Sequence, residues 1–186
     1  MKVNDIPKFI NPPHYRVTVA WDYLEEWIAD KADTQGLPGS LGIDLDPDFQ
    51  RGHVWTQDKQ KAYVEFCLRG GQSSRTLLWN HPNWMGDWKG MLVLVDGKQR
   101  LEAVRKFVRN ELPIFAGVRL NDFDDPKRLL RGTYASFEFG VNNLKTRPEL
   151  LEWYLQLNDG GVVHTPEEIQ RVRDLLEAEK AKKGLG

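Results

Sequence analysis

The sequence predicts a mixed α+β domain in which a small sheet is surrounded by helices. Short β-rich runs are interspersed with longer segments of helical periodicity, which is the order expected of this class. A chain of 186 residues with 40% hydrophobic residues and seven tryptophans can fill one core. We find no internal repeat or low-complexity tract, so we expect an irregular lead-in at residues 1–16 and a single domain at residues 17–186.

The first half of the chain alternates between helical and strand patterns. Thr18 is expected to cap a helix with Trp21, Leu24, Trp27 and Ile28 on its core-facing side. A short strand follows at residues 42–45. A second helix begins after Thr56 and stops at the glycine pair 70–71. Two β-rich runs at residues 75–79 and 91–95 enclose a loop with Trp84 and Trp88, and a third helix is expected from about residue 99 to 109.

Signals in the second half are weaker until two capping motifs appear. Residues 113–120 are interpreted as a strand, 121–126 as a turn cluster and 134–141 as a strand with alternating aromatic side chains. Thr146 and Glu149 form a capping box that opens a helix. Thr165 and Glu168 repeat the box, with proline at the first helical position, and predict a C-terminal helix at residues 166–182.

Charge and cysteine content limit the classes of protein. The 26 basic and 27 acidic residues leave a net charge of −1, which excludes attraction of the whole molecule to nucleic acid or to an anionic membrane. Any DNA contact would need a local patch. The single cysteine, Cys67, excludes an internal disulfide framework and is expected to be a buried, inert thiol in a reducing cytosol. Residues 1–10 lack an apolar signal core and no run is long enough to span a membrane, so we expect a cytoplasmic protein.

The stretch from Asp96 to Arg100 predicts a phosphate-sized anion site. It lies where a strong apolar run ends and a helical pattern begins, so unpaired backbone N–H groups and the positive end of the helix dipole would meet the charges of Lys98 and Arg100. Gly97 allows a sharp turn and close approach of a ligand. A simple turn without function is an equal alternative for Asp-Gly.

A second loop supplies possible partners for this stretch. Gln50 and Arg51 end a strand-like segment and are followed by His53 and Trp55. Arg51 could bind a phosphate with two hydrogen bonds, and Trp55 could stack on a base or anchor the loop. A surface arginine in an ion pair beside a core tryptophan is the alternative.

Other motifs are excluded by their spacing. Asp44, Asp46 and Asp48 alternate as in a calcium loop, but Phe49 occupies the position that needs glycine and Trp55 the position that needs glutamate. Four scattered histidines and one cysteine give no zinc-ligand spacing. The sequence also lacks a P-loop and a nucleophile elbow. We therefore expect no zinc, calcium or haem.

Three motifs in this order resemble the N-terminal domain of the GmrSD-type family. They are Pro-x-x-Gln-Arg-x-x-x-Trp at residues 47–55, an Asp-Gly-Lys-Gln-Arg form of the Asp-Gly-Gln-Gln-Arg box at residues 96–100, and Leu-Asn-x-x-Gly at residues 157–161. The resemblance covers roughly residues 17–172. It implies a ParB/sulfiredoxin-like fold in which the box binds phosphate at a strand-to-helix turn.

The resemblance also implies a role for each matched residue. Asp96 and Gln99 would be catalytic, with Asp96 as a possible magnesium ligand; a cap of the adjacent turn is an equal alternative for Asp96. The predicted phosphate- or nucleotide-binding residues are Gln50, Arg51, Gly97, Lys98 and Arg100. The possible base-stacking or loop-anchoring residues, His53 and Trp55, follow from the composition of the loop itself. Lys98 departs from the family's first glutamine and adds a charge. The family's C-terminal His-Asn-His nuclease domain is missing from the chain, so cleavage by that route is not expected.

These motifs predict a nucleotide- or phosphate-binding domain. If the domain is an enzyme, the expected activity is that of a nucleoside triphosphatase. The family setting implies a link to DNA processing or to phage and restriction conflict, in a bacterial or phage-infected cell. The alternative is a non-catalytic ParB-like module that contacts DNA or a DNA-processing protein. A third hypothesis is protein binding through the loop of Trp84 and Trp88.

Overall fold

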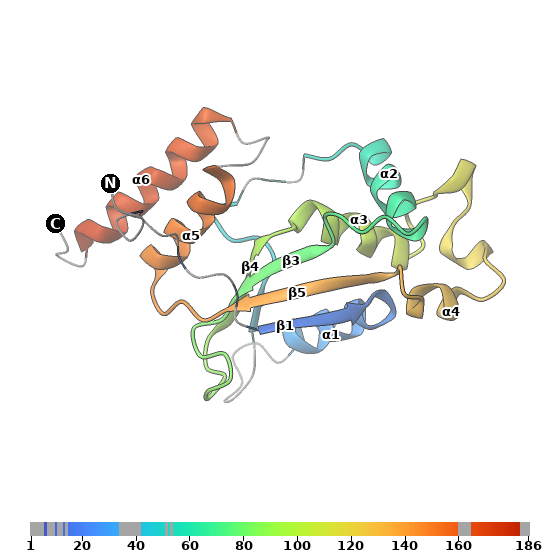
Figure 1. Cartoon of the computed structure of the whole chain (residues 1–186), viewed down its shortest axis with the longest axis horizontal. Coiled ribbons are helices and arrows are strands. Elements are labelled where there is room, and N and C mark those ends of the chain that lie inside the picture. The colour runs from blue at the N-terminus through green and yellow to red at the C-terminus, as the bar shows by residue number, and fades with distance from the viewer. Residues whose placement is uncertain are drawn as a thin grey trace.

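The computed structural model describes residues 6, 10, 13, 15–33, 42–50, 52, 54–159 and 165–182. Its centre is a five-stranded mixed sheet in the order β1-β5-β3-β4-β2 (Figure 1). The strands are β1 (Tyr15–Ala20), β2 (Gly42–Asp44), β3 (Thr76–Asn80), β4 (Met91–Asp96) and β5 (Ser136–Asn142). The pairs β1·β5 and β3·β4 are antiparallel, whereas β3·β5 and β2·β4 are parallel.

Helices surround this sheet. They are α1 (Leu24–Asp33), α2 (Gln57–Leu68), α3 (Lys98–Val108), α4 (Pro126–Arg131), α5 (Arg147–Asp159) and α6 (Pro166–Lys182). Figure 1 shows α5 and α6 together near one end of the sheet and α2 and α4 near the other. The predicted mixed α+β class is therefore confirmed. None of the described helices is both long and apolar enough to cross a membrane.

Buried apolar side chains form two clusters. The larger one joins the sheet to α1, α2 and α3 and includes Trp21, Trp79 and Phe107. The smaller one joins Phe49 and Val95 to the α5–α6 pair. Leu94 belongs to the larger cluster and its neighbour Val95 to the smaller one, and successive side chains of a strand point to opposite faces, so the two clusters lie on opposite faces of β4.

Most of the predicted elements are confirmed. Thr56 caps α2 by accepting a hydrogen bond from the Lys59 N–H at 3.3 Å. Both capping boxes form: the Thr146 N–H donates to Glu149 at 2.8 Å, and the Thr165 N–H donates to Glu168 at 3.0 Å. The C-terminal helix has the predicted bounds, Pro166–Lys182.

The prediction for Thr18 was wrong. This residue lies within β1, and the following 3-10 helix, Trp21–Tyr23, begins at Ala20 without a side-chain cap. β1 has the alternation of apolar and polar residues that is typical of a strand. Because no turn residue separates it from the helix that follows, the sequence pattern predicted the start of that helix at Thr18. Its first residue, Tyr15, falls inside the predicted lead-in. Trp21, Leu24 and Ile28 are buried, as predicted.

Residues 113–120 do not form the predicted strand. Ile114 and Val118 make one isolated bridge around the 3-10 helix Phe115–Gly117, and a further 3-10 helix spans Leu120–Asp122. Residues Phe115 and Ala116 have positive φ angles of 42° and 64°, which are incompatible with an extended strand. The helix α4 was also missed, because a turn cluster precedes its six residues.

The pKa values of Cys67 and of the partly buried Glu25 are shifted by their surroundings. Burial raises the pKa of the Cys67 thiol, which agrees with the predicted inert cysteine. Glu25 of α1 accepts hydrogen bonds from Arg105 at 2.6 Å and Arg109 at 2.7 Å. Partial burial alone would raise the pKa of Glu25, but these two arginines outweigh it and the pKa is lowered. This pair of contacts ties α1 to the end of α3.

Candidate functional site

The turn between β4 and α3 has the predicted strand-to-helix form. Asp96 ends β4, Gly97 has a φ of 104°, and α3 begins at Lys98; within the described residues, no side-chain cap is present at the N-cap position, Gly97. A Cβ atom added at Gly97 would lie 2.3 Å from Cδ2 of the buried Leu77. Only glycine therefore fits this position without displacing the core, and the prediction for Asp96 and Gly97 is confirmed.

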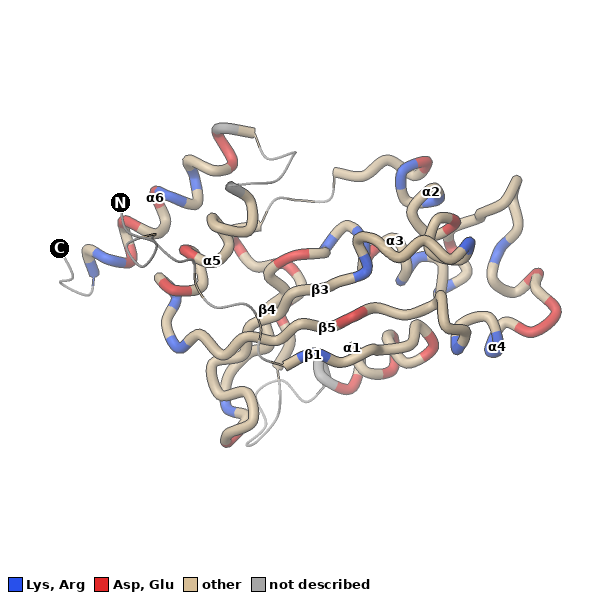
Figure 2. The backbone as a smooth tube through the Cα atoms, viewed as in Figure 1, with Lys and Arg blue, Asp and Glu red and all other residues tan. Residues whose placement is uncertain are grey.

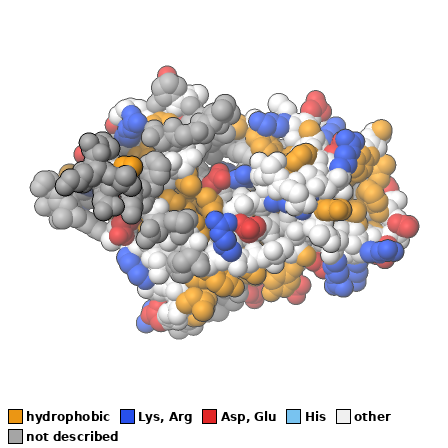
Figure 3. All heavy atoms as spheres, viewed as in Figure 1, with side chains coloured by type: hydrophobic (Ala, Val, Ile, Leu, Met, Phe, Trp, Pro, Cys, Tyr) orange, Lys and Arg blue, Asp and Glu red, His pale blue; other side chains and the backbone are white. Residues whose placement is uncertain are grey.

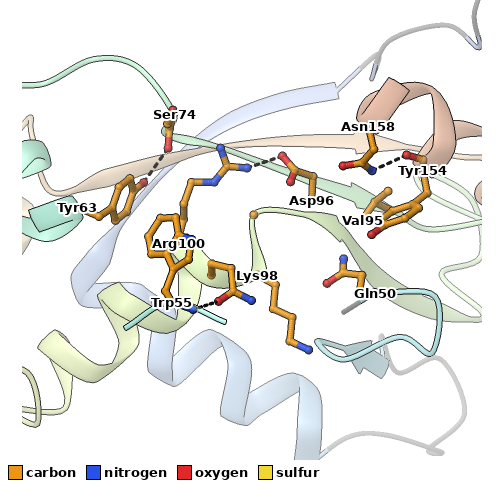
Figure 4. A pocket seen from close by; sticks show the side chains of 12 residues that line it. Gln50, Trp55, Tyr63, Ser74, Val95, Asp96, Lys98, Arg100, Tyr154 and Asn158 are labelled. Atoms are coloured by element: carbon orange, nitrogen blue, oxygen red, sulfur yellow. Dashed lines mark hydrogen bonds and ion pairs between the residues drawn. The ribbon is translucent and has the colours of Figure 1, made fainter. Parts of the chain in front are cut away.

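A pocket of about 290 Å³ lies beside this turn (Figure 4). Its walls come from the loop after β2, from α2, from the β4–α3 turn and from α5. The lining residues are Gln50, Trp55, Tyr63, Ser74, Val95, Asp96, Gly97, Lys98, Gln99, Arg100, Tyr154 and Asn158. Two segments predicted from the sequence, residues 50–55 and 96–100, thus contribute to one cavity.

The charged side chains of the pocket are held in ion pairs. Arg100 donates through Nη2 to Oδ2 of Asp96, and Figure 4 shows the two groups facing each other. Lys98 pairs with Asp46, which lies just after β2. Both basic side chains are 17% exposed, whereas the Asp96 side chain is 49% exposed. The cations are therefore recessed, and the carboxylate of Asp96 is the more accessible group.

Gln99 fastens the neighbouring loop to the start of α3. Its Oε1 accepts hydrogen bonds from the backbone N–H groups of Val54 at 3.0 Å and Trp55 at 3.1 Å. Its Nε2 donates to the Gly52 carbonyl at 3.1 Å. Gln99 is 8% exposed, so these contacts give it a positioning role. The catalytic role predicted for Gln99 stays a prediction.

The same loop is also held on its other side. Gln50 donates from Nε2 to the Leu94 carbonyl of β4 at 2.5 Å. Arg171 of α6 donates to the carbonyls of Asp48, Phe49 and Gln50, at 2.5, 3.2 and 3.1 Å. The loop position therefore depends on both β4 and the C-terminal helix.

Aromatic rings form the α2 side of the pocket. The rings of Trp55 and Tyr63 meet edge to face with centroids 5.5 Å apart, and the Tyr63 hydroxyl donates to the Ser74 carbonyl at 2.8 Å. Burial raises the pKa of Tyr63, so this phenol stays protonated. Lys59 lies over the Trp55 ring at 5.0 Å. Trp55 is half-buried and anchors the loop, which is one of its two predicted roles.

Some predicted site residues lie outside the described residues. Arg51 and His53 are among them, so the prediction that Arg51 faces Arg100 stays a prediction. The glycines of the third motif, 160 and 161, are also outside, but its Asn158 lines the pocket.

The sequence did not indicate Tyr63, Ser74 or Tyr154 as pocket residues. Tyr63 and Tyr154 lie on α2 and α5, two helices that the sequence predicted. Tyr154 and Asn158 are four residues apart and therefore share one face of α5, a spacing that could have linked them. Their proximity to the β4–α3 turn depends on the tertiary fold.

Among the described residues, no three His, Cys, Asp or Glu side chains gather closely enough to hold a metal ion. No family model, characterised protein or solved structure matches the chain. The resemblance to the GmrSD-type family and the ParB/sulfiredoxin-like fold therefore stay predictions.

Proposed function

We propose that the pocket beside the β4–α3 turn binds a small phosphate-bearing ligand of the nucleotide class. The observation that carries this proposal is the junction of an uncapped helix N-terminus with two recessed cations, Lys98 and Arg100, on one cavity. Backbone N–H groups and the helix dipole favour an anion at this position. Arg100 can exchange its Asp96 partner for a phosphate oxygen.

The shape and lining of the pocket favour a small ligand. Its volume of about 290 Å³ lies just below the range for small-molecule sites, roughly 300–1,000 Å³. Trp55 and Tyr63 offer an apolar side, and the β4–α3 turn offers a polar one. A nucleotide has the same division between an aromatic base and charged phosphates.

A DNA-binding module is the second candidate, and the charge distribution supports it less well. Phosphates of a duplex are reached by exposed basic side chains, but Lys98 and Arg100 are recessed. Figure 2 shows acidic and basic residues interspersed along the described chain. Figure 3 shows both signs of charge interspersed on the visible face.

Protein binding through the loop between β3 and β4 is supported still less. Trp84 packs against the larger core cluster, and the ring of Trp88 lies 4.8 Å from that of Trp84. Both rings are half-buried, and Met85 is the large apolar side chain that this loop exposes.

In the triphosphatase form of the proposal, Asp96 is the catalytic residue. Magnesium is commonly bound through one or two carboxylates together with substrate phosphates. The accessible carboxylate of Asp96 fits this donor set, and the ion would neutralise charge on the phosphates. Arg100 would then stabilise phosphate charge directly.

Calorimetry with nucleoside mono-, di- and triphosphates, with and without magnesium, tests the proposal. Arg100→Gln removes a charge-assisted contact and should weaken phosphate binding about tenfold or more. Arg131→Gln is the matched control, because Arg131 at the end of α4 pairs with Asp22, and neither residue lines the pocket. Arg51→Gln tests the sequence prediction for Arg51 in the same way.

The outcomes separate the candidate functions. Loss of turnover in Asp96→Asn, with binding retained, would support hydrolysis. Binding of duplex DNA that weakens steeply with salt, in the absence of nucleotide binding, would replace the proposal with the DNA-binding module. Equal affinity of Arg100→Gln and wild type for every nucleotide would refute the phosphate site.

A further inference from the structure

Two amide side chains on the α5 and β2 sides of the pocket have fixed orientations. Asn158 donates from Nδ2 to the Tyr154 carbonyl at 2.6 Å, and Gln50 donates from Nε2 to the Leu94 carbonyl at 2.5 Å. A backbone carbonyl can only accept a hydrogen bond. The NH₂ group of each amide must therefore face its carbonyl, and the reversed orientation would place two acceptors together.

This orientation leaves an oxygen of each amide for the pocket. Within the described part of the chain, no hydrogen-bond donor contacts Oδ1 of Asn158 or Oε1 of Gln50. Both residues line the cavity. Figure 4 shows the Asn158 oxygen on the side that faces Asp96 and the Gln50 oxygen on the side that faces Lys98. The wall thus presents two hydrogen-bond acceptors.

We propose that Asn158 and Gln50 determine specificity by accepting hydrogen bonds from the nucleoside part of the ligand. This inference rests on the nucleotide function proposed above. Carbonyl oxygens repel phosphate oxygens, so the phosphates are directed to Arg100 and the start of α3. The complementary groups on a nucleoside are donors: the sugar hydroxyls or an exocyclic amino group of the base.

The ligand must therefore carry a hydrogen-bond donor outside its phosphate groups. Inorganic polyphosphate has none, and its binding should be independent of Asn158 and Gln50. A nucleoside that lacks the recognised donor leaves the amide oxygen desolvated without a partner, which costs affinity. The sugar and the base are distinguished by removing their donors separately.

Calorimetry with three probes in EDTA tests the assignment without a metal contribution. The probes are adenosine triphosphate, its 2′,3′-dideoxy analogue and its analogue without the 6-amino group. Wild type should bind one analogue more weakly than adenosine triphosphate, by roughly two- to tenfold for each lost hydrogen bond. The analogue that loses affinity identifies the sugar or the base as the donor.

Variants then assign the preference to residues. Asn158→Ala should lose the preference for the donor while retaining wild-type affinity for tripolyphosphate. Gln50→Met should also lose the preference, and because it removes the hydrogen bond to the Leu94 carbonyl, its tripolyphosphate affinity is measured as well. Asn158 is next to last in α5, and alanine favours helix, so this variant should fold. Asn121→Ala, at an exposed position of the 3-10 helix Leu120–Asp122, is the control. Thermal midpoints of all variants establish that they are folded.

The results distinguish failure of this inference from failure of the nucleotide function. Wild type that binds tripolyphosphate and discriminates neither analogue would overturn the inference alone. The same holds if Asn158→Ala and Gln50→Met are both folded and keep the full preference. Wild type that binds neither tripolyphosphate nor any nucleotide would overturn both.

Discussion

Replacement of Gly97 by alanine should destabilise the protein for two separate reasons. The φ of 104° is a conformation that L-residues rarely adopt, and the new methyl group would meet Leu77 at 2.3 Å. Leu77 is fully buried and belongs to the larger core cluster, so it has little room to move. The substitution therefore adds backbone strain and overpacking at one position.

Two other glycines separate these contributions. A Cβ atom at Gly117 would have no heavy atom within 4 Å, but its φ is 113°, so Gly117→Ala carries the backbone cost of about 1–2 kcal/mol alone. A Cβ atom at Gly52 would also lie in open space, and its φ is not in the left-handed region. Gly52→Ala should be neutral or slightly stabilising, by up to about 1 kcal/mol. Overpacking at Gly97 adds about 1–3 kcal/mol, for a total of about 2–5 kcal/mol.

Urea unfolding followed by tryptophan fluorescence and circular dichroism measures the three free energies of unfolding. We expect Gly52→Ala to be the most stable variant, Gly117→Ala to be less stable and Gly97→Ala to be the least stable. A Gly97→Ala protein as stable as Gly117→Ala would show that Leu77 does not pack beneath the turn. The structure of the β4–α3 turn, on which the phosphate site depends, would then be wrong.

Two further variants test contacts on either side of α3. Gln99→Met removes three hydrogen bonds to the neighbouring loop. It should lower the free energy of unfolding by about 1–3 kcal/mol and speed hydrogen exchange of the loop amides. Gln72→Met, at an exposed glutamine, should change neither quantity. The two arginine partners lower the pKa of Glu25 in the folded protein. Its carboxylate therefore stabilises the fold fully above about pH 4.3, the ordinary pKa of glutamate, and this contribution is lost as the pH falls through the lowered pKa. The difference in unfolding free energy between wild type and Glu25→Gln should therefore shrink on acidification below pH 4.3; a pH-independent difference, or an equal effect of Glu26→Gln, would contradict the assignment.

The elements that the sequence predicted well have local signals. Capping boxes at Thr146 and Thr165 and the cap at Thr56 place hydrogen-bonding groups within four residues of each other, so their pattern is visible along the chain. The β4–α3 turn is similar, because an apolar run, a glycine and a helical period follow in order. Local chemistry is sufficient in these cases.

The remaining elements depend on contacts that are distant in sequence. β1 is a strand because Tyr15 to Ala20 pair with β5, more than 110 residues away, and its own residues also fit a helix start. The pocket contains Tyr63 and Tyr154 for the same reason: their helices are brought to β4 by packing. Gln99 was predicted as catalytic from its motif, but its hydrogen bonds to the loop become visible only in three dimensions.

The position of the pocket between two hydrophobic clusters has a consequence for unfolding. Tyr63 belongs to the larger cluster and Tyr154 to the smaller one, and both line the same cavity. A ligand that contacts both walls would couple the melting of the α5–α6 pair to that of the sheet. Near-ultraviolet signals from Trp153 in the smaller cluster and from Trp79 in the larger one would then change at the same temperature when ligand is bound. Without ligand, the difference between the two melting temperatures would report how tightly the two clusters are coupled.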